Sequence, residues 1–276
     1  FDNGEVFRGS GINLCWEGRT WDTPAYNFSY EYYLPKLANN GVNFIRTWMC
    51  YWNMPLEWKR VSNETYRYNN STDYYHPEGI QRMEEFLQLC ETNDMYVMLT
   101  IEAHGSIVGN EWNDNPYNSV NGGPCYNKVD FFTNNAAKTK FKNRLRYIIA
   151  RWGYSPHIAV WELFNEIDNV SDPLGISSSV ITSWHQEMSA YLKQIDPYNH
   201  LVSTSISHRE INGLNSISTI DFNQKHIYHD NADASDIIPA LINYSNNFNK
   251  PYVIGECGWT WDWNKNFNDP NTQENL

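Results

Sequence analysis

Short strand-like runs alternate with longer helical patterns along most of this 276-residue chain. The strand-like runs lie at 6–14, 42–49, 95–103, 157–165, 200–207, 221–228 and 251–257. Strands that alternate with helices join through crossover connections and build a parallel sheet. The strand-plus-helix unit repeats along the chain without a break. This repetition favours an α/β fold closed into a (β/α)8 barrel, the TIM barrel, over an open doubly wound sheet.

Helical stripes separate the strand-like runs. Apolar residues recur with the 3.6-residue period of an α-helix over 83–90, 141–152 and 181–195. These stripes are the surfaces that helices pack against a barrel. Gly41 and Gly153 follow two of the expected helices, where we predict left-handed caps.

The end of the sequence leaves little room for the eighth step of a barrel. After Glu256 only residues 257–276 remain. A strand, a crossover helix and a second strand together take about 30 residues or more. We therefore expect one catalytic domain over 1–276 that lacks its eighth βα unit, and a natural polypeptide that continues past Leu276.

The charge and composition narrow the possible partners. There are 32 acidic and 20 basic residues, and the net charge is −12. This excess disfavours nucleic acid and anionic membranes as partners. No apolar run approaches the roughly 20 residues of a membrane-spanning helix. The 12 Trp, 19 Tyr and 12 Phe residues suit a neutral ligand with flat faces, such as a sugar.

The five cysteines form no C-x-x-C pair. Three of them, Cys15, Cys50 and Cys257, fall beside predicted strand ends, so a metal cluster is one interpretation. Buried, unreactive thiols are the better interpretation. We assign no zinc site, no other metal and no cofactor.

Two glutamates close predicted strands. Glu166 follows the fourth strand in VWELFNEID, and Glu256 closes the seventh in VIGECGW. Barrel enzymes carry their chemistry at the carboxyl ends of strands, so both side chains are expected at one pocket. Hydrolysis of a glycosidic bond needs one protonated carboxyl and one ionised carboxylate, about 5 Å apart when configuration is retained.

Further strand-end residues accompany this pair. They are Arg46 on the second strand, His104 after the third, Asn165 before Glu166, and His226 and Tyr228 on the sixth. With the two glutamates, in this order, they resemble glycoside hydrolase family 5, the cellulase and mannanase family of the clan-A barrels. The resemblance covers nearly the whole chain.

The resemblance implies a role for each residue. Glu166 would be the general acid/base, and Glu256 the nucleophile that forms a covalent glycosyl-enzyme. Asn165 would bind the sugar 2-hydroxyl, Arg46 would keep the nucleophile ionised, and Tyr228 would donate a hydrogen bond to it.

The resemblance also implies sugar contacts around the glutamates. His104 and His226 would line the subsite. Independently of the resemblance, Trp16 and Trp259 lie near predicted strand ends and are candidate sugar platforms. Family members carry a Trp on strand eight as the floor of the cleavage subsite, and this sequence has no such strand. Because that floor is absent, the sequence as printed could lack turnover.

Structural interpretations compete for several of these residues. Arg46 could instead form a buried ion pair with Glu162 or Glu102, because buried arginines need partners. His104 and His226 could be hydrogen-bonded parts of the pocket wall.

A metal site is a further alternative. His226, His229 and Asp230 include two metal-ligand residue types, but the spacing of the histidines puts their rings on opposite faces of a strand. We therefore assign no metal to these residues.

Three classes of function follow from these patterns. The first is a retaining, endo-acting β-glycanase, with β-1,4-glucan ahead of β-mannan as substrate. The second is a carbohydrate-binding barrel that no longer hydrolyses its ligand, and the third is a metal-dependent barrel hydrolase. We expect a secreted monomer that acts on a β-linked polysaccharide or oligosaccharide.

Overall fold

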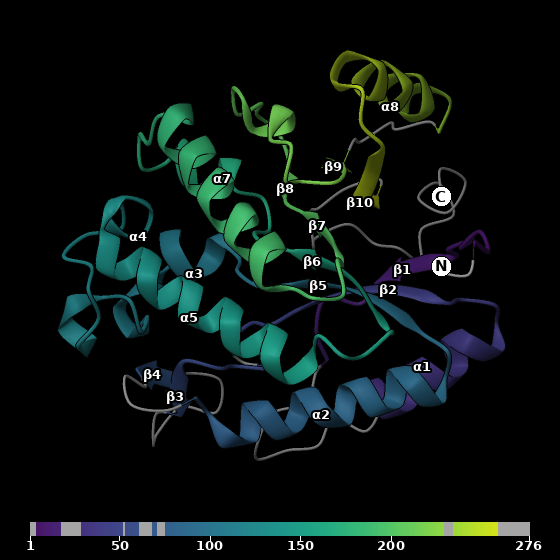
Figure 1. The fold of residues 1–276 in the computed structure, drawn as a ribbon, viewed down its shortest axis with the longest axis horizontal. Coiled ribbons are helices and arrows are strands. Elements are labelled where there is room, and N and C mark those ends of the chain that lie inside the picture. Colours follow the sequence, from purple (N-terminus) through teal and green to yellow (C-terminus); the bar gives the residue numbers. More distant parts are fainter. Residues whose placement is uncertain are drawn as a thin grey trace, which may run out of the picture.

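Parallel strands form the centre of the molecule (Figure 1). The computed structural model describes residues 4–17, 29–51, 53–60, 68–70, 75–228 and 234–258. One sheet has the order β1 (Gly11–Asn13), β2 (Phe44–Trp48), β5 (Tyr96–Thr100), β6 (Ile158–Glu162) and β7 (Leu201–Ser203). A second sheet has the order β10 (Tyr252–Gly258), β9 (Asn223–Tyr228) and β8 (Ser205–Ile206).

The two sheets are joined through one continuous run of chain. Strands β7 and β8 are separated only by Thr204, and β7 pairs with β6 while β8 pairs with β9. All of these pairings are parallel, and neighbouring strands follow the order of the chain. The strand predicted at each of the seven runs is therefore confirmed.

The two outer strands have one partner each within the described ranges. There, β1 pairs only with β2, and β10 pairs only with β9. Residues 259–276 lie outside the described part of the chain. The missing eighth unit and the single-domain assignment therefore stay predictions.

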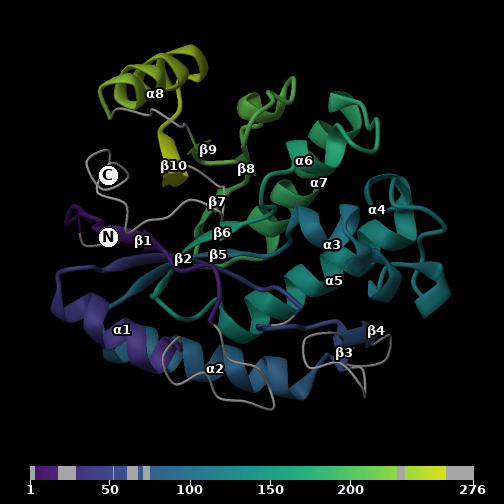
Figure 2. The same cartoon turned by 180° about the vertical axis from the view of Figure 1, so that it is seen from behind.

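The long helices lie outside the strands, with α5 and α7 in front and α1 and α2 along the lower edge in Figure 1; Figure 2 gives the view from behind. These helices are α1 (Tyr30–Asn39), α2 (Pro77–Thr92), α5 (Asn135–Trp152), α7 (Ser178–Ile195) and α8 (Ala234–Phe248). The three helical stripes lie on α2, α5 and α7, as predicted. None of the described helices is both long enough and apolar enough to cross a membrane.

The helix ends confirm one predicted glycine cap and correct the other. Gly41 follows α1 with φ +83°, in the left-handed region. Gly153 has φ −60°, so the left-handed cap predicted there is wrong. A Cβ at Gly153 would lie 2.7 Å from the carbonyl oxygen of Ile149, and this close approach explains the glycine instead.

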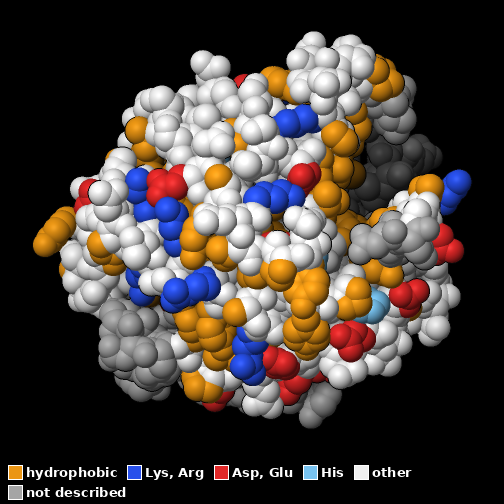
Figure 3. All heavy atoms as spheres, viewed as in Figure 1, with side chains coloured by type: hydrophobic (Ala, Val, Ile, Leu, Met, Phe, Trp, Pro, Cys, Tyr) orange, Lys and Arg blue, Asp and Glu red, His pale blue; other side chains and the backbone are white. Residues whose placement is uncertain are grey.

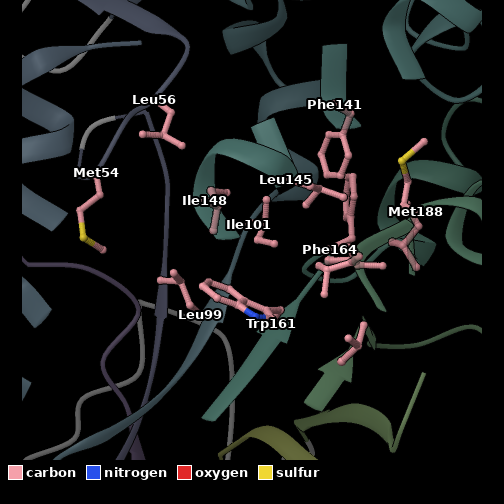
Figure 4. Close-up of a cluster of buried hydrophobic side chains, with 14 of the residues drawn as sticks. Met54, Leu56, Leu99, Ile101, Phe141, Leu145, Ile148, Trp161, Phe164 and Met188 are labelled. Carbon is pink, nitrogen blue, oxygen red and sulfur yellow. The ribbon is translucent and has the colours of Figure 1, made fainter. Parts of the chain in front are cut away.

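The core lies between the strands and α5 and α7 (Figure 4). Leu99 and Trp161 from the strands, Leu145 and Ile148 from α5 and Met188 from α7 all have no exposed surface. Burying such a side chain stabilises the fold by about 1.5–3 kcal/mol. This packing holds the carboxyl ends of β5 and β6 in fixed positions.

The two irregular segments predicted as substrate loops carry structure of their own. Segment 50–76 contains the antiparallel hairpin of β3 (Trp58–Arg60) and β4 (Tyr68–Asn70). Segment 104–133 contains α3 (His104–Val108), η1 (Asn110–Asp114), η2 (Ser119–Asn121) and α4 (Asp130–Thr133). Two further short elements are α6 (Asp168–Ser171) and η3 (Leu214–Ser216).

Basic side chains gather over α5 in the space-filling view (Figure 3). Lys138 and Lys142 of α5 both pair with Glu187 of α7, at 2.9 and 2.7 Å. Pairs this exposed contribute about 0–1 kcal/mol each. The pairing ties α5 to α7 on the outer surface, away from the strand ends.

Candidate active site

Glu166 and Glu256 come together at the carboxyl ends of the strands. A carboxylate oxygen of each and a ring nitrogen of His226 lie within 4.8 Å of one another. Both glutamates are partly exposed, while His226 is buried. Carboxyl groups about 5–5.5 Å apart are the arrangement of retaining glycosidases, so this separation is compatible with double displacement.

A β-bulge directs Glu256 toward this site. Strand β10 shifts register against β9 between Ile254 and Glu256, which places Glu256 opposite His226. A Cβ on the intervening Gly255 would lie 2.3 Å from Oε1 of Gln224. Bulges redirect a side chain in this way, and only glycine leaves room for the close approach.

Glu166 has a strained backbone. Its φ is +51°, in the left-handed region that a residue with a long side chain rarely adopts. The hydroxyl of Ser205 accepts a hydrogen bond from its amide at 2.9 Å and helps to hold this conformation. Such strain persists where the surrounding structure fixes it, and it often occurs at functional sites.

Glu256 is held by two donors. Nη1 of Arg46 lies 2.5 Å from Oε1, and the hydroxyl of Tyr228 donates to Oε2 at 2.6 Å. Burial raises the pKa of Tyr228 well above its usual range, and the hydrogen bond to Glu256 and its charge raise it further. The phenol therefore stays protonated and remains a hydrogen-bond donor to the carboxylate.

Arg46 makes both kinds of contact that the sequence suggested, one with Glu256 and one with a buried carboxylate. Its Nε and Nη2 donate to the two oxygens of Glu162 at 2.7 Å each, and Nη2 also donates to Oδ1 of Asn165 at 2.7 Å. The ion pair with Glu162 and the contact with Glu256 thus coexist. Glu102, the other candidate partner, pairs instead with Arg144 at 2.7 Å.

Glu162 is a fully buried carboxylate that stays ionised. Burial raises its pKa, but the charge and hydrogen bonds of Arg46, the charge of His226 and the hydroxyl of Thr100 lower it more. The pKa therefore lies below its usual range. Glu162 fixes the guanidinium plane that reaches Glu256.

Glu166 has a different set of partners. Nδ1 of His226 lies 2.8 Å from Oε1, Nδ1 of His104 lies 3.6 Å from Oε2, and Asn169 donates to Oε2 at 3.1 Å. Burial raises the pKa of Glu166, but the hydrogen bond and charge of His226 and the charges of His104 and Arg46 lower it more. The pKa of Glu166 therefore lies below its usual range, and His226 is its nearest partner.

Asn165 is fully buried between these two halves of the site. Its Oδ1 accepts from Arg46, and its Nδ2 lies 3.1 Å from Nδ1 of His104. The amide orientation is therefore fixed by partners on both sides. Binding of a sugar hydroxyl by Asn165 stays a prediction.

The segment after Glu166 carries site residues that sequence reasoning missed. The carboxylate of Asp168 accepts backbone hydrogen bonds from residues 207–209 and one from the Ser207 hydroxyl, at 2.8–3.1 Å. Asn169 bridges Glu166 and Ser207. The only signal in the sequence was their position directly after Glu166, since their partners are about 40 residues away.

Trp16, one of the two predicted sugar platforms, lies against a second tryptophan. The rings of Trp16 and Trp48 meet edge to face at 5.2 Å, and both line a cavity beside His104. Trp112 is 8% exposed and belongs to the core. Trp259 lies outside the described residues.

Three residues of this site have side chains that can bind a metal ion. Glu166, His226 and Glu256 could each offer one ligand atom to an ion. The guanidinium of Arg46 already lies against Glu256, and its charge disfavours a second cation there. His229 and Asp230 lie outside the described residues.

The cysteines form no metal-ligand group in the described ranges. Cys50, Cys90 and Cys125 are buried, as predicted for unreactive thiols. Cys257 is exposed, so its predicted burial is wrong, because it points away from the barrel where Glu256 points in. Burial, together with the charge of Glu256, raises the pKa of the Cys15 thiol to about 12.

Parallel strands enclosed by helices, with two carboxylates at strand ends, define a (β/α)-barrel protein with a paired-carboxylate site, the arrangement found in retaining glycosidases. Comparison with known protein families identifies the family within this class. The chain belongs to glycosyl hydrolase family 5, the cellulase family, whose family model matches residues 2–275.

Several curated proteins similar to this chain carry the name of a mannan endo-1,4-beta-mannosidase. The chain is 25% identical over 231 residues to the probable mannan endo-1,4-beta-mannosidase F of Neosartorya fischeri, covering 73% of this chain and 45% of that protein. It is 30% identical over 179 residues to the mannan endo-1,4-beta-mannosidase A of Aspergillus aculeatus, covering 55% and 43%. The chain thus spans about half the length of the curated relatives it matches.

A solved structure shares the fold. The endo-beta-1,4-mannanase from Thermotoga petrophila matches with a TM-score of 0.63 and 20% identity, over 93% of this chain and 62% of that one. At this identity the likeness shows the fold alone. The α/β barrel predicted from the sequence is confirmed.

Proposed function

We propose that this protein hydrolyses β-linked glycans by double displacement, with Glu166 as acid/base and Glu256 as nucleophile. One observation carries the proposal: oxygens of the two carboxylates lie within 4.8 Å of each other. Glu256 has an arginine and a phenol as donors, which suits a carboxylate that attacks as an anion. Oε1 of Glu166 lies 2.8 Å from a ring nitrogen of His226, a neighbour that suits a group that must give and take a proton.

The reaction follows from these partners. In the first step an oxygen of Glu256 attacks the anomeric carbon, and the bond to the leaving oxygen breaks as Glu166 protonates it. In the second step Glu166 takes a proton from water, the water oxygen bonds to the anomeric carbon, and Glu256 leaves. The configuration of the anomeric carbon is inverted twice and therefore retained.

We propose β-1,4-mannan as the substrate, in place of the β-1,4-glucan preferred from the sequence. The named relatives and the similar solved structure are endo-acting mannanases, which supports this choice. We further propose that the protein acts outside the cell as a monomer, because a polysaccharide of this kind is met there.

The test uses the intact protein with β-mannan, β-1,4-glucan and aryl β-mannosides. Glu256→Ala is expected to lower kcat by on the order of 10³-fold or more, and a 2-fluoro mannoside is expected to label Glu256. Glu91→Gln, an exposed glutamate on α2, is the matched control. Labelling of another residue would overturn the nucleophile assignment, and binding of oligosaccharides without hydrolysis would favour the non-hydrolytic barrel.

A further inference from the structure

Asp168 is a buried carboxylate two positions after the candidate acid/base. Its side chain has no exposed surface, and among the described residues it forms no ion pair. Oδ1 accepts from the amide of Ser207 at 2.8 Å, and Oδ2 accepts from the amides of His208 and Arg209 at 2.8 and 3.1 Å. Backbone N–H groups only donate, so both oxygens of Asp168 act as acceptors.

The hydroxyl of Ser207 has its direction set by this carboxylate. It donates to Oδ2 of Asp168 at 3.0 Å, so its single hydrogen is used there. Toward any other neighbour the Ser207 oxygen can only accept. That neighbour is the side-chain amide of Asn169, whose Nδ2 lies 3.2 Å away.

The side-chain amide of Asn169 therefore has one favourable orientation. Nδ2 donates one hydrogen to the Ser207 oxygen and the other to Oε2 of Glu166, at 3.2 and 3.1 Å. The flipped amide would place its carbonyl oxygen against two oxygens, neither of which has a hydrogen to give. Both contacts would then be repulsive, so this series of hydrogen bonds runs in one direction only.

The backbone keeps the end of this series in place at Glu166. The amide of Asn169 donates to the carbonyl of Glu166 at 3.0 Å, and the amide of Ile167 donates to the carbonyl of Ser205 at 3.1 Å. Glu166 itself has φ +51°, a strained conformation that persists only where contacts such as these fix it. Asn169 is thus held at a constant position relative to the Glu166 carboxylate.

We propose that Asn169 is a positioning residue for Glu166, and that it always presents a hydrogen-bond donor to Oε2. Asp168 and Ser207 act through Asn169, because they fix the direction of its amide. The inference rests on the proposed function. When Glu166 gives its proton to the leaving oxygen it becomes an anion, which this donor stabilises and holds in place until Glu166 takes a proton from water. Asn169 keeps both of its hydrogens throughout.

Other charged or titratable groups also face Glu166. They come from β2, α3, β9 and β10 and are Arg46, His104, His226, Tyr228 and Glu256. All of them are kept when Asn169 is replaced. A difference in the titration of Glu166 between variants at position 169 therefore reports the amide of Asn169.

The first test compares the pH profiles of Asn169→Asp, Asn169→Ala and the unchanged protein with aryl β-mannosides. Asn169→Asp keeps the shape of the side chain but replaces the donor with a carboxylate oxygen. The pKa of Glu166 should then rise, and the alkaline limb of kcat/KM should move to higher pH. Asn169→Ala only removes the donor and should move the limb in the same direction by less.

The second test varies the leaving group. A weakly acidic phenol needs a positioned acid to leave, so both variants should lower its kcat/KM by on the order of tenfold. A dinitrophenol leaves without a proton, so its kcat/KM should stay within about twofold. A loss of structure alone would lower both values equally.

Asn215→Asp is the matched control. Asn215 is also buried and also donates to a glutamate, Oε2 of Glu210 at 3.0 Å, but it lies on η3, outside the candidate site. This variant should keep the pH profile and the leaving-group dependence of the unchanged protein. Ser207→Ala frees the amide of Asn169 to turn and should give part of the Asn169→Ala effect. Thermal melting checks that every variant folds.

Two outcomes would overturn the proposal. If the unchanged protein is active and both Asn169 variants keep its alkaline limb and leaving-group dependence, Asn169 does not position Glu166, and the proposed function stands. If the unchanged protein hydrolyses no glycoside, the proposed function fails, and the carbon NMR signal of the Glu166 carboxyl group decides. An equal titration in the unchanged protein and in Asn169→Asp then overturns the proposal, and a shifted one supports Asn169 as the donor. Should Asn169→Asp fail to fold, Asn169→Ala decides.

Discussion

Nη1 of Arg46 lies 2.5 Å from Oε1 of Glu256, although the two residues are 210 positions apart in the chain. The rest of the guanidinium is engaged by Glu162, with two hydrogen bonds of 2.7 Å. The fork geometry of arginine allows both contacts at once. Glu256, on the three-stranded sheet, is therefore positioned by an arginine of the five-stranded sheet. The ion pair with Glu162 fixes the orientation of that guanidinium.

Replacement of Arg46 by lysine should separate charge from geometry. A lysine keeps the positive charge but has one compact ammonium group, which cannot hold Glu162 at two points and reach Glu256 as well. We expect kcat for an aryl β-mannoside to fall by on the order of 100-fold, with a smaller change in KM.

The control for this variant is Arg82→Lys. Arg82 is also buried and forks onto a carboxylate, that of Glu17, with hydrogen bonds of 2.8 and 2.6 Å. The Arg82→Lys variant should have a lower free energy of unfolding, but the folded variant should keep the kcat of the unchanged protein. A kcat for Arg46→Lys within twofold of the unchanged protein would contradict the positioning role.

Glu162→Gln should destabilise the fold. Breaking a buried ion pair leaves an uncompensated charge and costs about 3–5 kcal/mol. Here Arg46 keeps Glu256 as a partner, so the lower value is expected. Urea unfolding at pH 7 measures the change, with Glu91→Gln as the exposed control.

The same variant should change the dependence of stability on pH. The folded-state pKa of Glu162 lies below its ordinary value of 4.5, so its contribution is complete above pH 4.5 and is lost as the pH falls through the folded-state pKa. Glu162→Gln lacks this group, so its unfolding free energy should fall less steeply below pH 4.5. An equally steep fall would show that Glu162 is not ionised in the folded protein.

Much of the fold follows from local patterns in the sequence. Each strand-like run became a parallel strand, and β5 and β6, inside the first sheet, are buried on nearly all positions, as in a barrel wall. The break between β7 and β8 at Thr204 was not predicted, since it depends on how two sheets meet. Gly153 was misassigned because a C-terminal glycine fits two explanations, and only packing against Ile149 decides between them.

The candidate site could be predicted only as a set of strand ends. Glu166, Glu256 and Arg46 were found because a barrel brings the carboxyl ends of its strands together. Asp168 and Asn169, which hold the segment after Glu166, were not found, because their partners are distant in sequence. Asp168, for example, binds backbone groups of residues 207–209, whose N–H donors carry no side-chain signal.

His226→Asn should change the pH profile of the candidate acid. Burial raises the pKa of Glu166, and the hydrogen bond and charge of His226 are the main effects that lower it. Without them the pKa of Glu166 should rise. Because the first step needs a protonated Glu166, the alkaline limb of kcat/KM should move to higher pH, while kcat itself falls.

The pH profile of kcat/KM, measured with an aryl mannoside, checks this expectation. Tyr126→Ala, which removes a side chain that is 87% exposed, serves as the control and should leave both limbs in place. An alkaline limb that stays or moves to lower pH would show that His226 does not hold the pKa of Glu166 down.

His185 should make the fold sensitive to mild acid. It is fully buried, its Nδ1 contacts the carbonyl of Ile181 at 2.9 Å, and its Nε2 contacts the hydroxyl of Thr204 at 3.1 Å. Burial lowers its pKa from 6.5 to about 4, although the bond to Ile181 opposes this. Between pH 6.5 and about pH 4 the folded protein thus binds fewer protons than the unfolded chain. As the pH is lowered through this range, the free energy of unfolding should decrease by up to about 3 kcal/mol. His185→Asn should lose stability at pH 7 but vary less between pH 7 and pH 4, and an unchanged slope in urea unfolding would contradict the assignment.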